Sequence, residues 1–232
     1  MTALIRMRLA GFVRSGRALA PLIAALVLLS VLYGGGASLA ASAYGYSAVM
    51  LFPVLAWLTK LILDAEPDIQ RQLARLSVGP VRESAAGLLA ALLLGGVVCV
   101  LAMLAPVPFG AIRGPNPGTT EASLTAGVLL GVLAHLFALL AAVSLGALAG
   151  RAITRRVLPG VAVLATGSVL AIVLGLRGSI APWLVPPVMA TARELSAEAA
   201  PAVGTLVLLS GWTIGWCAAA LAVYAVLRRA RA

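Results

Sequence analysis

The sequence predicts an all-α protein that crosses a membrane several times, from its composition, the length of its apolar segments and the position of its basic residues. Hydrophobic residues make up 62% of the 232-residue chain and charged residues 10%, whereas soluble domains average about 45–50% and about 25%. A soluble fold of this size could not cover so much apolar surface with polar groups. The composition therefore excludes an ordinary soluble enzyme, a secreted disulfide scaffold and a disordered tail.

The chain is expected to form a single transmembrane domain over residues 1–232. A membrane-spanning helix needs about 20 predominantly apolar residues, and the strict alternation of barrel strands is missing. Six segments qualify: 19–41, 44–64, 84–108, 122–150, 158–176 and 202–227. The first follows a basic stretch, as the core of a signal peptide does, but its apolar run is too long for one. We therefore expect it to be retained as a span.

Basic residues predict the orientation of the spans. The net charge of +10 would indicate nucleic-acid binding in a soluble protein, but in a membrane protein such residues gather in cytoplasmic segments. With a cytoplasmic N-terminus, three arginines lie outside: Arg113, Arg177 and Arg193. The other thirteen lie inside: Arg6, Arg8, Arg14, Arg17, Arg71, Arg75, Arg82, Arg151, Arg155, Arg156, Arg228, Arg229 and Arg231. Both termini are therefore expected in the cytoplasm, and no nucleic acid is expected as a partner.

Residues 1–18 are predicted to form an amphipathic helix ahead of the first span. At 100° per residue one face is apolar and another is basic, although Arg8 interrupts the pattern. Such a helix lies in the inner membrane interface. The alternative is a basic flank that only sets the orientation. The apolar face would hold Ile5, Leu9, Phe12 and Val13, and the basic face Arg6, Arg14 and Arg17.

Residues 66–80 (EPDIQRQLARLSVGP) predict a short cytoplasmic helix of about ten residues between the second and third spans. A proline and Asp68 suit its first turn, and a glycine–proline pair ends it. Ile69, Leu73 and Leu76 follow the i, i+4, i+7 spacing and share one face. This apolar stripe is too small for a core. The helix therefore either lies on the membrane surface or docks a soluble partner.

Residues 177–201 predict an irregular segment on the outer side, between the last two spans. Pro182, Pro186 and Pro187 interrupt it too often for a span. Its apolar side chains, Trp183 among them, are too many for a free loop. We expect an outer re-entrant or interfacial hairpin whose broken backbone is covered by protein.

Together these segments resemble the permease subunit of a type-2 ABC exporter, the ABC-2 family. That family combines a cytoplasmic interfacial N-terminal helix, six spans, a coupling helix between spans two and three, and a re-entrant element before span six. Residues 66–68 (EPD) and 77–83 (SVGPVRE), with Gly87 one turn later, are similar to the family's acidic coupling segment and its Ser-Pro-Val-Ser-Arg-like link. Here two residues separate the serine from the proline, and Leu88 stands where a lysine often follows the glycine.

The resemblance implies that a separate ATP-binding subunit docks on the coupling helix. It also implies a second permease copy or a similar permease, with ATP and Mg²⁺ held by the ATPase and no cofactor bound directly by this chain. The chain lacks the Gly-x-x-x-x-Gly-Lys-Ser/Thr loop that holds ATP phosphates. Its one lysine, Lys60, lies near the inner end of the second span, where Asp64, one turn on, can pair with it. The docking residues would be Asp68, Ile69, Gln72, Leu73, Arg75 and Leu76.

Three residues within the spans are candidates for a translocation path: His135, Trp212 and Trp216. His135 lies near the middle of span four, where ionisable side chains are costly and often functional. The alternative is a neutral imidazole bonded to a neighbouring helix. The two tryptophans share a face of span six and either line an apolar cavity or pack. No metal site is expected, because the chain has one histidine.

Three pairs of glycines spaced four residues apart allow close approach of helices. We interpret them as packing positions, with a dimer interface as the alternative. The pairs are Gly127/Gly131, Gly146/Gly150 and Gly211/Gly215.

The sequence favours a permease subunit of an ATP-driven exporter in a bacterial plasma membrane. Few charges in the spans favour an apolar or amphipathic cargo, such as a drug, a lipid or a peptide. One alternative is a secondary transporter driven by an ion gradient, which would show internal repeats. Another is a membrane scaffold or assembly factor. Catalysis by the chain is not expected, because a His-Glu-x-x-His zinc site and paired intramembrane aspartates are both missing from the sequence.

Overall fold

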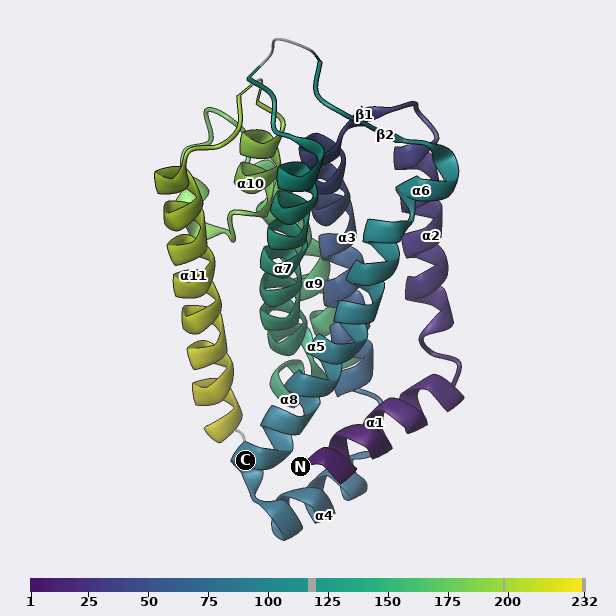
Figure 1. Cartoon of the computed structure of the whole chain (residues 1–232). Coiled ribbons are helices and arrows are strands. Elements are labelled where there is room, and N and C mark those ends of the chain that lie inside the picture. Colours follow the sequence, from purple (N-terminus) through teal and green to yellow (C-terminus); the bar gives the residue numbers. More distant parts are fainter. Residues whose placement is uncertain (117–119, 198, 231–232) are drawn as a thin grey trace.

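The computed structural model describes residues 1–116, 120–197 and 199–230, apart from the side chain of Asp68. About 78% of the structure is helical, which confirms the all-α class. Within the described residues, four helical segments are long and apolar enough to cross a membrane, and they run side by side along the molecule (Figure 1). They are α3 (Ala40–Leu63), α5 with α6 (Pro80–Leu104 and Pro106–Phe109), α7 with α8 (Leu124–Ala149 and Arg151–Thr154) and α11 (Val203–Arg229).

Two further apolar helices are shorter than the predicted first and fifth spans. Helix α2 (Leu19–Tyr33) has 15 residues and is followed by three consecutive glycines, of which Gly36 has a φ of 112°. Helix α9 (Val157–Val173) has 17 residues. Helices α1 (Thr2–Arg14) and α2 are long enough for a span only when taken together, and they are bent by 76°. The described chain thus has four candidate spans, or five if α1 and α2 count as one.

Helix α1 crosses the ends of α3 and α5 instead of running along them (Figure 1). Phe12, on its predicted apolar face, is buried. Val13, which was predicted on the same face, is 59% exposed; it lies one residue before the helix ends. The crosswise position is the one that an amphipathic helix in a membrane interface would take.

Helices α3 and α7 form the central pair of the bundle, with the most extensive contact between any two elements described. Glycines of α7 make this contact close. A Cβ atom built on Gly131 would lie 2.6 Å from the Cβ of Tyr44, and one on Gly146 would lie 2.6 Å from the carbonyl oxygen of Ala56. A Cβ on Gly211 of α11 would meet nothing within 4 Å. Gly127, Gly131 and Gly146 therefore serve packing within the chain, whereas the pair in α11 has an open face.

Replacing Gly146 with alanine should destabilise the fold by about 1–3 kcal/mol, the usual cost of overpacking a close contact. The matched change Gly211→Ala should leave stability unchanged or raise it slightly, because alanine favours a helix more than glycine does. Denaturant unfolding of the two purified variants in detergent measures the difference. Equal stability of the two variants would contradict a close contact between α3 and α7.

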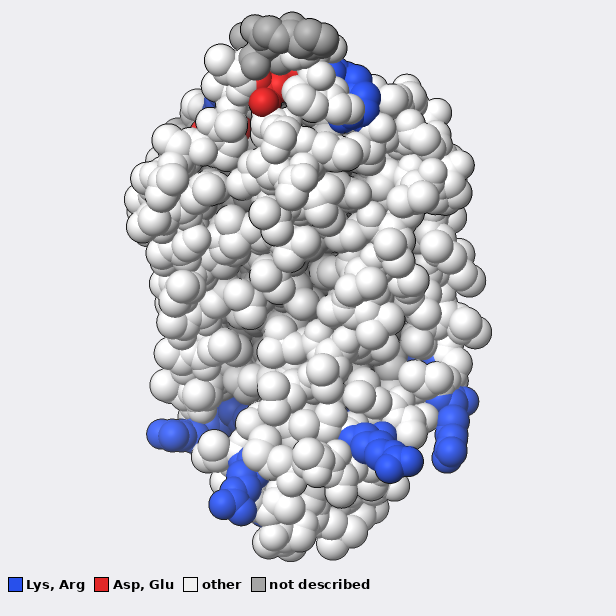
Figure 2. All heavy atoms as spheres, in the orientation of Figure 1, with Lys and Arg blue, Asp and Glu red and all other residues white. Residues whose placement is uncertain are grey.

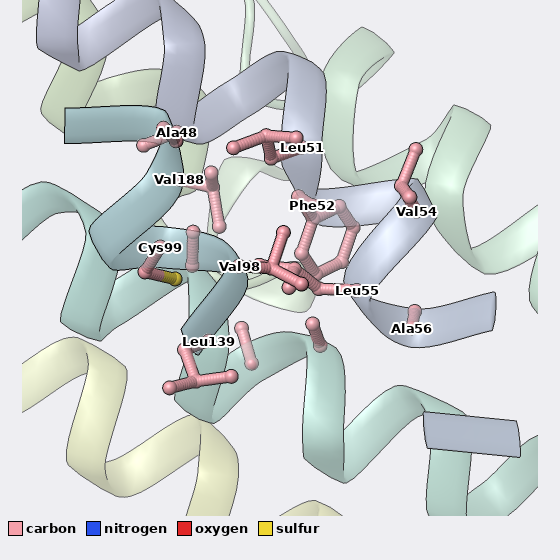
Figure 3. Packing of buried hydrophobic residues seen from close by; sticks show 14 of the residues in the cluster. Ala48, Leu51, Phe52, Val54, Leu55, Ala56, Val98, Cys99, Leu139 and Val188 are labelled. Atoms are coloured by element: carbon pink, nitrogen blue, oxygen red, sulfur yellow. The ribbon is translucent and has the colours of Figure 1, made fainter. Parts of the chain in front are cut away.

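The apolar core fills the space between the central pair and its neighbours. Phe52 and Leu55 of α3 meet Val98 of α5 and Leu139 of α7 (Figure 3), and all four are buried. At one end of the bundle, β1 (Ser38–Leu39) pairs in parallel with β2 (Ile112–Arg113). This pairing ties the loop after α2 to the loop after α6.

The predicted irregular segment 177–201 contains a 3₁₀ turn, η1 (Pro182–Leu184), and α10 (Val188–Leu195). Helix α10 packs against α3 and α7. The two consecutive prolines before it, Pro186 and Pro187, are fully buried. Residues 185–192 are thus covered by protein, whereas Ile180, Trp183 and Leu184 before them are 95%, 68% and 54% exposed. The expected covering by protein therefore applies to only part of the segment.

The surface separates charge from apolar area. Figure 2 shows one face on which charged atoms lie near the two ends of the molecule and a wide band between them carries none. One end, called the α4 end here, is formed by α1 and by α4 (Asp68–Val78) and holds the end of α11 (Figure 1). The β1–β2 end lies opposite. Long apolar helices with an uncharged band fit a multi-pass membrane protein.

Candidate functional site

Helix α4 lies beyond the ends of the bundled helices (Figure 1), and its apolar side faces away from them. It begins after Pro67 and ends at Gly79, which takes a φ of 85° and is followed by Pro80 at the first position of α5. A positive φ suits glycine, which has no Cβ. The turn separates two helices that would otherwise continue into each other. Helix α4 is thus a separate helix, joined to the start of α5 by a sharp turn at Gly79.

The apolar stripe of α4 has no partner among the described residues. Leu76 is 86% exposed, Ile69 72% and Leu73 61%. Gln72 is also exposed, and Arg75 is half-buried. The side chain of Asp68, the remaining predicted docking residue, lies outside the described part of the structure. Five of the six predicted docking residues are therefore described, and the three apolar ones form one exposed face.

The opposite side of α4 is fastened to the bundle. Arg71 is buried and donates a hydrogen bond of 2.9 Å to the carbonyl oxygen of Leu63, at the end of α3. The Nε atom of Arg75 lies 3.5 Å from a carboxylate oxygen of Glu83 in α5. A force on α4 would therefore reach the ends of two candidate spans through side-chain contacts as well as through the chain.

Glu83 is the centre of a buried ion-pair cluster. Arg8 of α1 donates a hydrogen bond of 2.7 Å to its carboxylate and one of 2.9 Å to its carbonyl oxygen. Arg228 of α11 pairs with the same carboxylate and also donates to the hydroxyl of Tyr224. The side chain of Glu83 is only 4% exposed. One carboxylate thus joins α1, α4, α5 and α11.

Arg8 is also buried in this cluster, with a side chain that is 6% exposed. Its Nε and Nη2 atoms donate to the two carboxylate oxygens of Glu66, each at 2.6 Å, which is the bidentate geometry that guanidinium favours. Burial alone would lower the pKa of Arg8, but the hydrogen bonds and charges of Glu66 and Glu83 outweigh it and raise the pKa. Arg8 is therefore a permanent cation held by two carboxylates.

Gly87 makes room for Arg8. A Cβ atom at Gly87 would lie 2.6 Å from Nη1 of Arg8 and 2.9 Å from Leu63. The lack of a side chain at Gly87 thus lets α5 pass close to the buried guanidinium of Arg8.

A second ion-pair group lies beside the first. Lys60 and Asp64 of the α3 end are paired at 2.6 Å, as their spacing predicted. The other oxygen of Asp64 accepts a hydrogen bond of 2.7 Å from the backbone N–H of Arg151, and the guanidinium of Arg151 donates to the Asp64 carbonyl oxygen at 2.8 Å. This group ties α3 to the start of α8.

His135 is buried against α3, within the bundle. Its Nδ1 lies 2.8 Å from the carbonyl oxygen of Gly131, and its Nε2 lies 3.1 Å from the hydroxyl of Ser47. With the proton on Nδ1, the ring donates to Gly131. The Ser47 hydroxyl also lies 3.0 Å from the carbonyl oxygen of Tyr44, so its one proton is shared between that oxygen and Nε2. The ring also borders a hollow of about 800 Å³ between α5 and α7, whose lining is largely apolar.

The two tryptophans do not share this hollow. Trp212 packs with Phe137, Ala190 and Leu209, between α7, α10 and α11. Trp216 donates a hydrogen bond of 2.9 Å to the carbonyl oxygen of Leu184 in η1. The structure therefore does not bring His135, Trp212 and Trp216 into one cavity, because neither tryptophan lines the hollow beside His135.

The sequence interpretation did not identify the ion-pair cluster of Arg8, Glu66, Glu83 and Arg228. The one visible signal was Arg8, which interrupted an otherwise amphipathic pattern. Within the described ranges, no group of three or more His, Cys, Asp or Glu side chains could hold a metal ion. Comparison of the chain with protein-family models, curated proteins and solved structures finds no match.

Proposed function

We propose that this chain is the permease subunit of an ATP-driven exporter of the ABC-2 type. In this proposal the chain has six transmembrane segments, and α4 is the coupling helix. One observation carries it: α4 presents an unpartnered apolar face away from the bundle while its other side is fastened to the span ends by Arg71 and Arg75. A helix that served only to pack against the rest of the chain would bury its apolar side in that contact.

The α4 end is the cytoplasmic end in this proposal. The basic residues that the positive-inside rule assigns to the cytoplasm include those of α1, α4 and the end of α11, and these elements share that end. Both termini then lie in the cytoplasm of a multi-pass plasma-membrane protein. An ATPase in the cytoplasm can reach the exposed stripe from below without entering the bilayer.

Coupling would run through the Glu83 cluster. ATP-driven closure of the partner displaces α4, and the Arg75–Glu83 contact passes the movement to α5. The same carboxylate holds Arg8 and Arg228, so α1 and α11 move with α5. The chemistry of ATP belongs to the partner subunit, where ATP and Mg²⁺ are bound. This chain supplies the mechanical link.

A second permease, either another copy or a similar chain, would complete the translocation path. The hollow beside His135 opens on the side of the bundle, and its largely apolar lining favours an apolar or amphipathic cargo. His135 would give that lining its one imidazole, beside the hydroxyl of Tyr44 and the thiol of Cys99. The tryptophans of α11 then serve packing against α10 and η1.

The experiment that tests the proposal is affinity purification of the tagged chain from its native membrane in mild detergent. The co-purified proteins are identified and assayed for vanadate-sensitive ATPase activity. We expect a soluble ATPase in stoichiometric amount. An intact, folded chain that brings down no ATPase would overturn the proposal. Ion-driven flux by the purified chain would then favour a secondary transporter, and the lack of any flux a scaffold.

A further inference from the structure

A groove lies between α5 and α11 at the α4 end. Both helices pack against α7, but they share few contacts with each other, and the space left between them measures about 410 Å³. Val81 and Leu88 of α5 line one wall, and Leu221 and Ala225 of α11 line the other. The walls are apolar and belong to two candidate spans, so they lie where lipid chains would be.

The rim of this groove is cationic. Arg75, Arg228 and Arg229 border it. The cluster beside it holds three guanidiniums, those of Arg8, Arg75 and Arg228, against the two carboxylates of Glu66 and Glu83, so it keeps one excess positive charge. Arg229 adds another, since it has no ion-pair partner within the described part of the chain. The rim therefore carries positive charge that the acidic residues around it do not neutralise, and this charge can bind an anion.

We propose that this groove binds an anionic phospholipid, with the phosphate at Arg228 and Arg229 and an acyl chain between Val81, Leu88 and Leu221. Arginine pairs with phosphate in a bidentate way, and basic pockets between transmembrane helices on the cytoplasmic side bind anionic head groups. The occupant must be both anionic at the rim and apolar within, and a lipid of the facing leaflet is both. This inference rests on the cytoplasmic orientation proposed above, but not on ATP-driven transport or on a partner ATPase.

Native mass spectrometry of the delipidated chain in detergent tests it. Phosphatidylglycerol, phosphatidylethanolamine and inorganic phosphate are added separately. We expect phosphatidylglycerol to bind at least about fivefold more tightly than phosphatidylethanolamine, the factor that one arginine near a membrane surface supplies. Equal affinity for the two lipids would overturn the proposal. Equally tight binding of inorganic phosphate would also overturn it, because it would indicate an anion site without a role for the apolar groove.

Three variants locate the site. Arg229→Gln should weaken phosphatidylglycerol binding about fivefold, and Ala225→Trp, which fills the groove from an exposed position, should abolish it. The matched control is Arg82→Gln, which removes the same charge from an exposed arginine outside the groove lining. It should change binding less than twofold. An equal loss with Arg82→Gln and Arg229→Gln would mean diffuse attraction and contradict the site. An Ala225→Trp variant that still binds phosphatidylglycerol would contradict the site as well, whatever its oligomeric state.

Discussion

Replacing both Leu73 and Leu76 with aspartate should leave the chain inserted and folded but abolish its association with the ATPase proposed as its partner. The two leucines are 61% and 86% exposed, so they contribute little to the fold. Two charges on an apolar contact face would be buried without partners in a complex, which is costly. The measurement is the amount of ATPase co-purified with the tagged variant and the ATPase activity of the mixture.

The matched control for this double variant is Gln70→Asp. It places a carboxylate on an exposed polar position of the same helix, beside the apolar stripe. We expect normal association. Unchanged ATPase stimulation by the Leu73→Asp, Leu76→Asp variant would contradict the docking assignment of α4. If Gln70→Asp abolished association as fully, charge on the helix rather than loss of the apolar contact would be the cause.

A cysteine scan separates docking from the alternative that α4 lies in the membrane surface. Cys99 and Cys217 are both buried, so single cysteines at Leu76 and at Leu208, an exposed position of α11 outside the hollow, can be labelled selectively with an environment-sensitive fluorophore. In vesicles without ATPase, the label at Leu76 should report water and the label at Leu208 should report lipid. Adding the ATPase should shift the signal of the label at Leu76 and leave that of the label at Leu208 unchanged. A lipid-like signal at Leu76 without ATPase would favour the membrane-surface alternative.

Replacing Glu83 with alanine should destabilise the chain by about 3–5 kcal/mol, the usual cost of removing one partner from a buried ion pair. The substitution leaves the guanidiniums of Arg8, Arg75 and Arg228 close together without their shared carboxylate. It also removes the ion pairs that join Arg8 of α1 and Arg228 of α11 to α5. Denaturant unfolding in detergent measures the change in the free energy of unfolding.

Glu194→Ala is the matched control, because Glu194 is exposed in α10. We expect a change within about 0.5 kcal/mol, as for most surface positions. A similar small effect for Glu83→Ala would show that the cluster does not hold the four helices together. In a functional complex, a Glu83→Gln variant that keeps ATPase association but loses cargo transport would place the defect in transmission rather than docking.

Much of this protein could be predicted from its sequence, because some properties depend on residues close together in the chain. The apolar segments predict long helices wherever they occur. Ile69, Leu73 and Leu76 share a face in any α-helix over residues 66–80, and Gly79 with Pro80 ends that helix in any setting. Lys60 and Asp64 are one turn apart, and their pairing follows from helix geometry. These local rules determined the helical class, the position of α4 and its amphipathic character.

Only the tertiary structure decided which side of α4 faces outward and what holds it. Arg8 and Glu83 are separated by 75 residues, and Glu83 and Arg228 by 145, so no periodicity in the sequence relates them. In the sequence, Arg8 only interrupts an amphipathic pattern. In the structure, Glu66 and Glu83 place their carboxylates around it. A buried charge needs partners, and partners distant in sequence are found only once the helices are packed. The same packing separated His135 from Trp212 and Trp216, and it left the groove between α5 and α11 open.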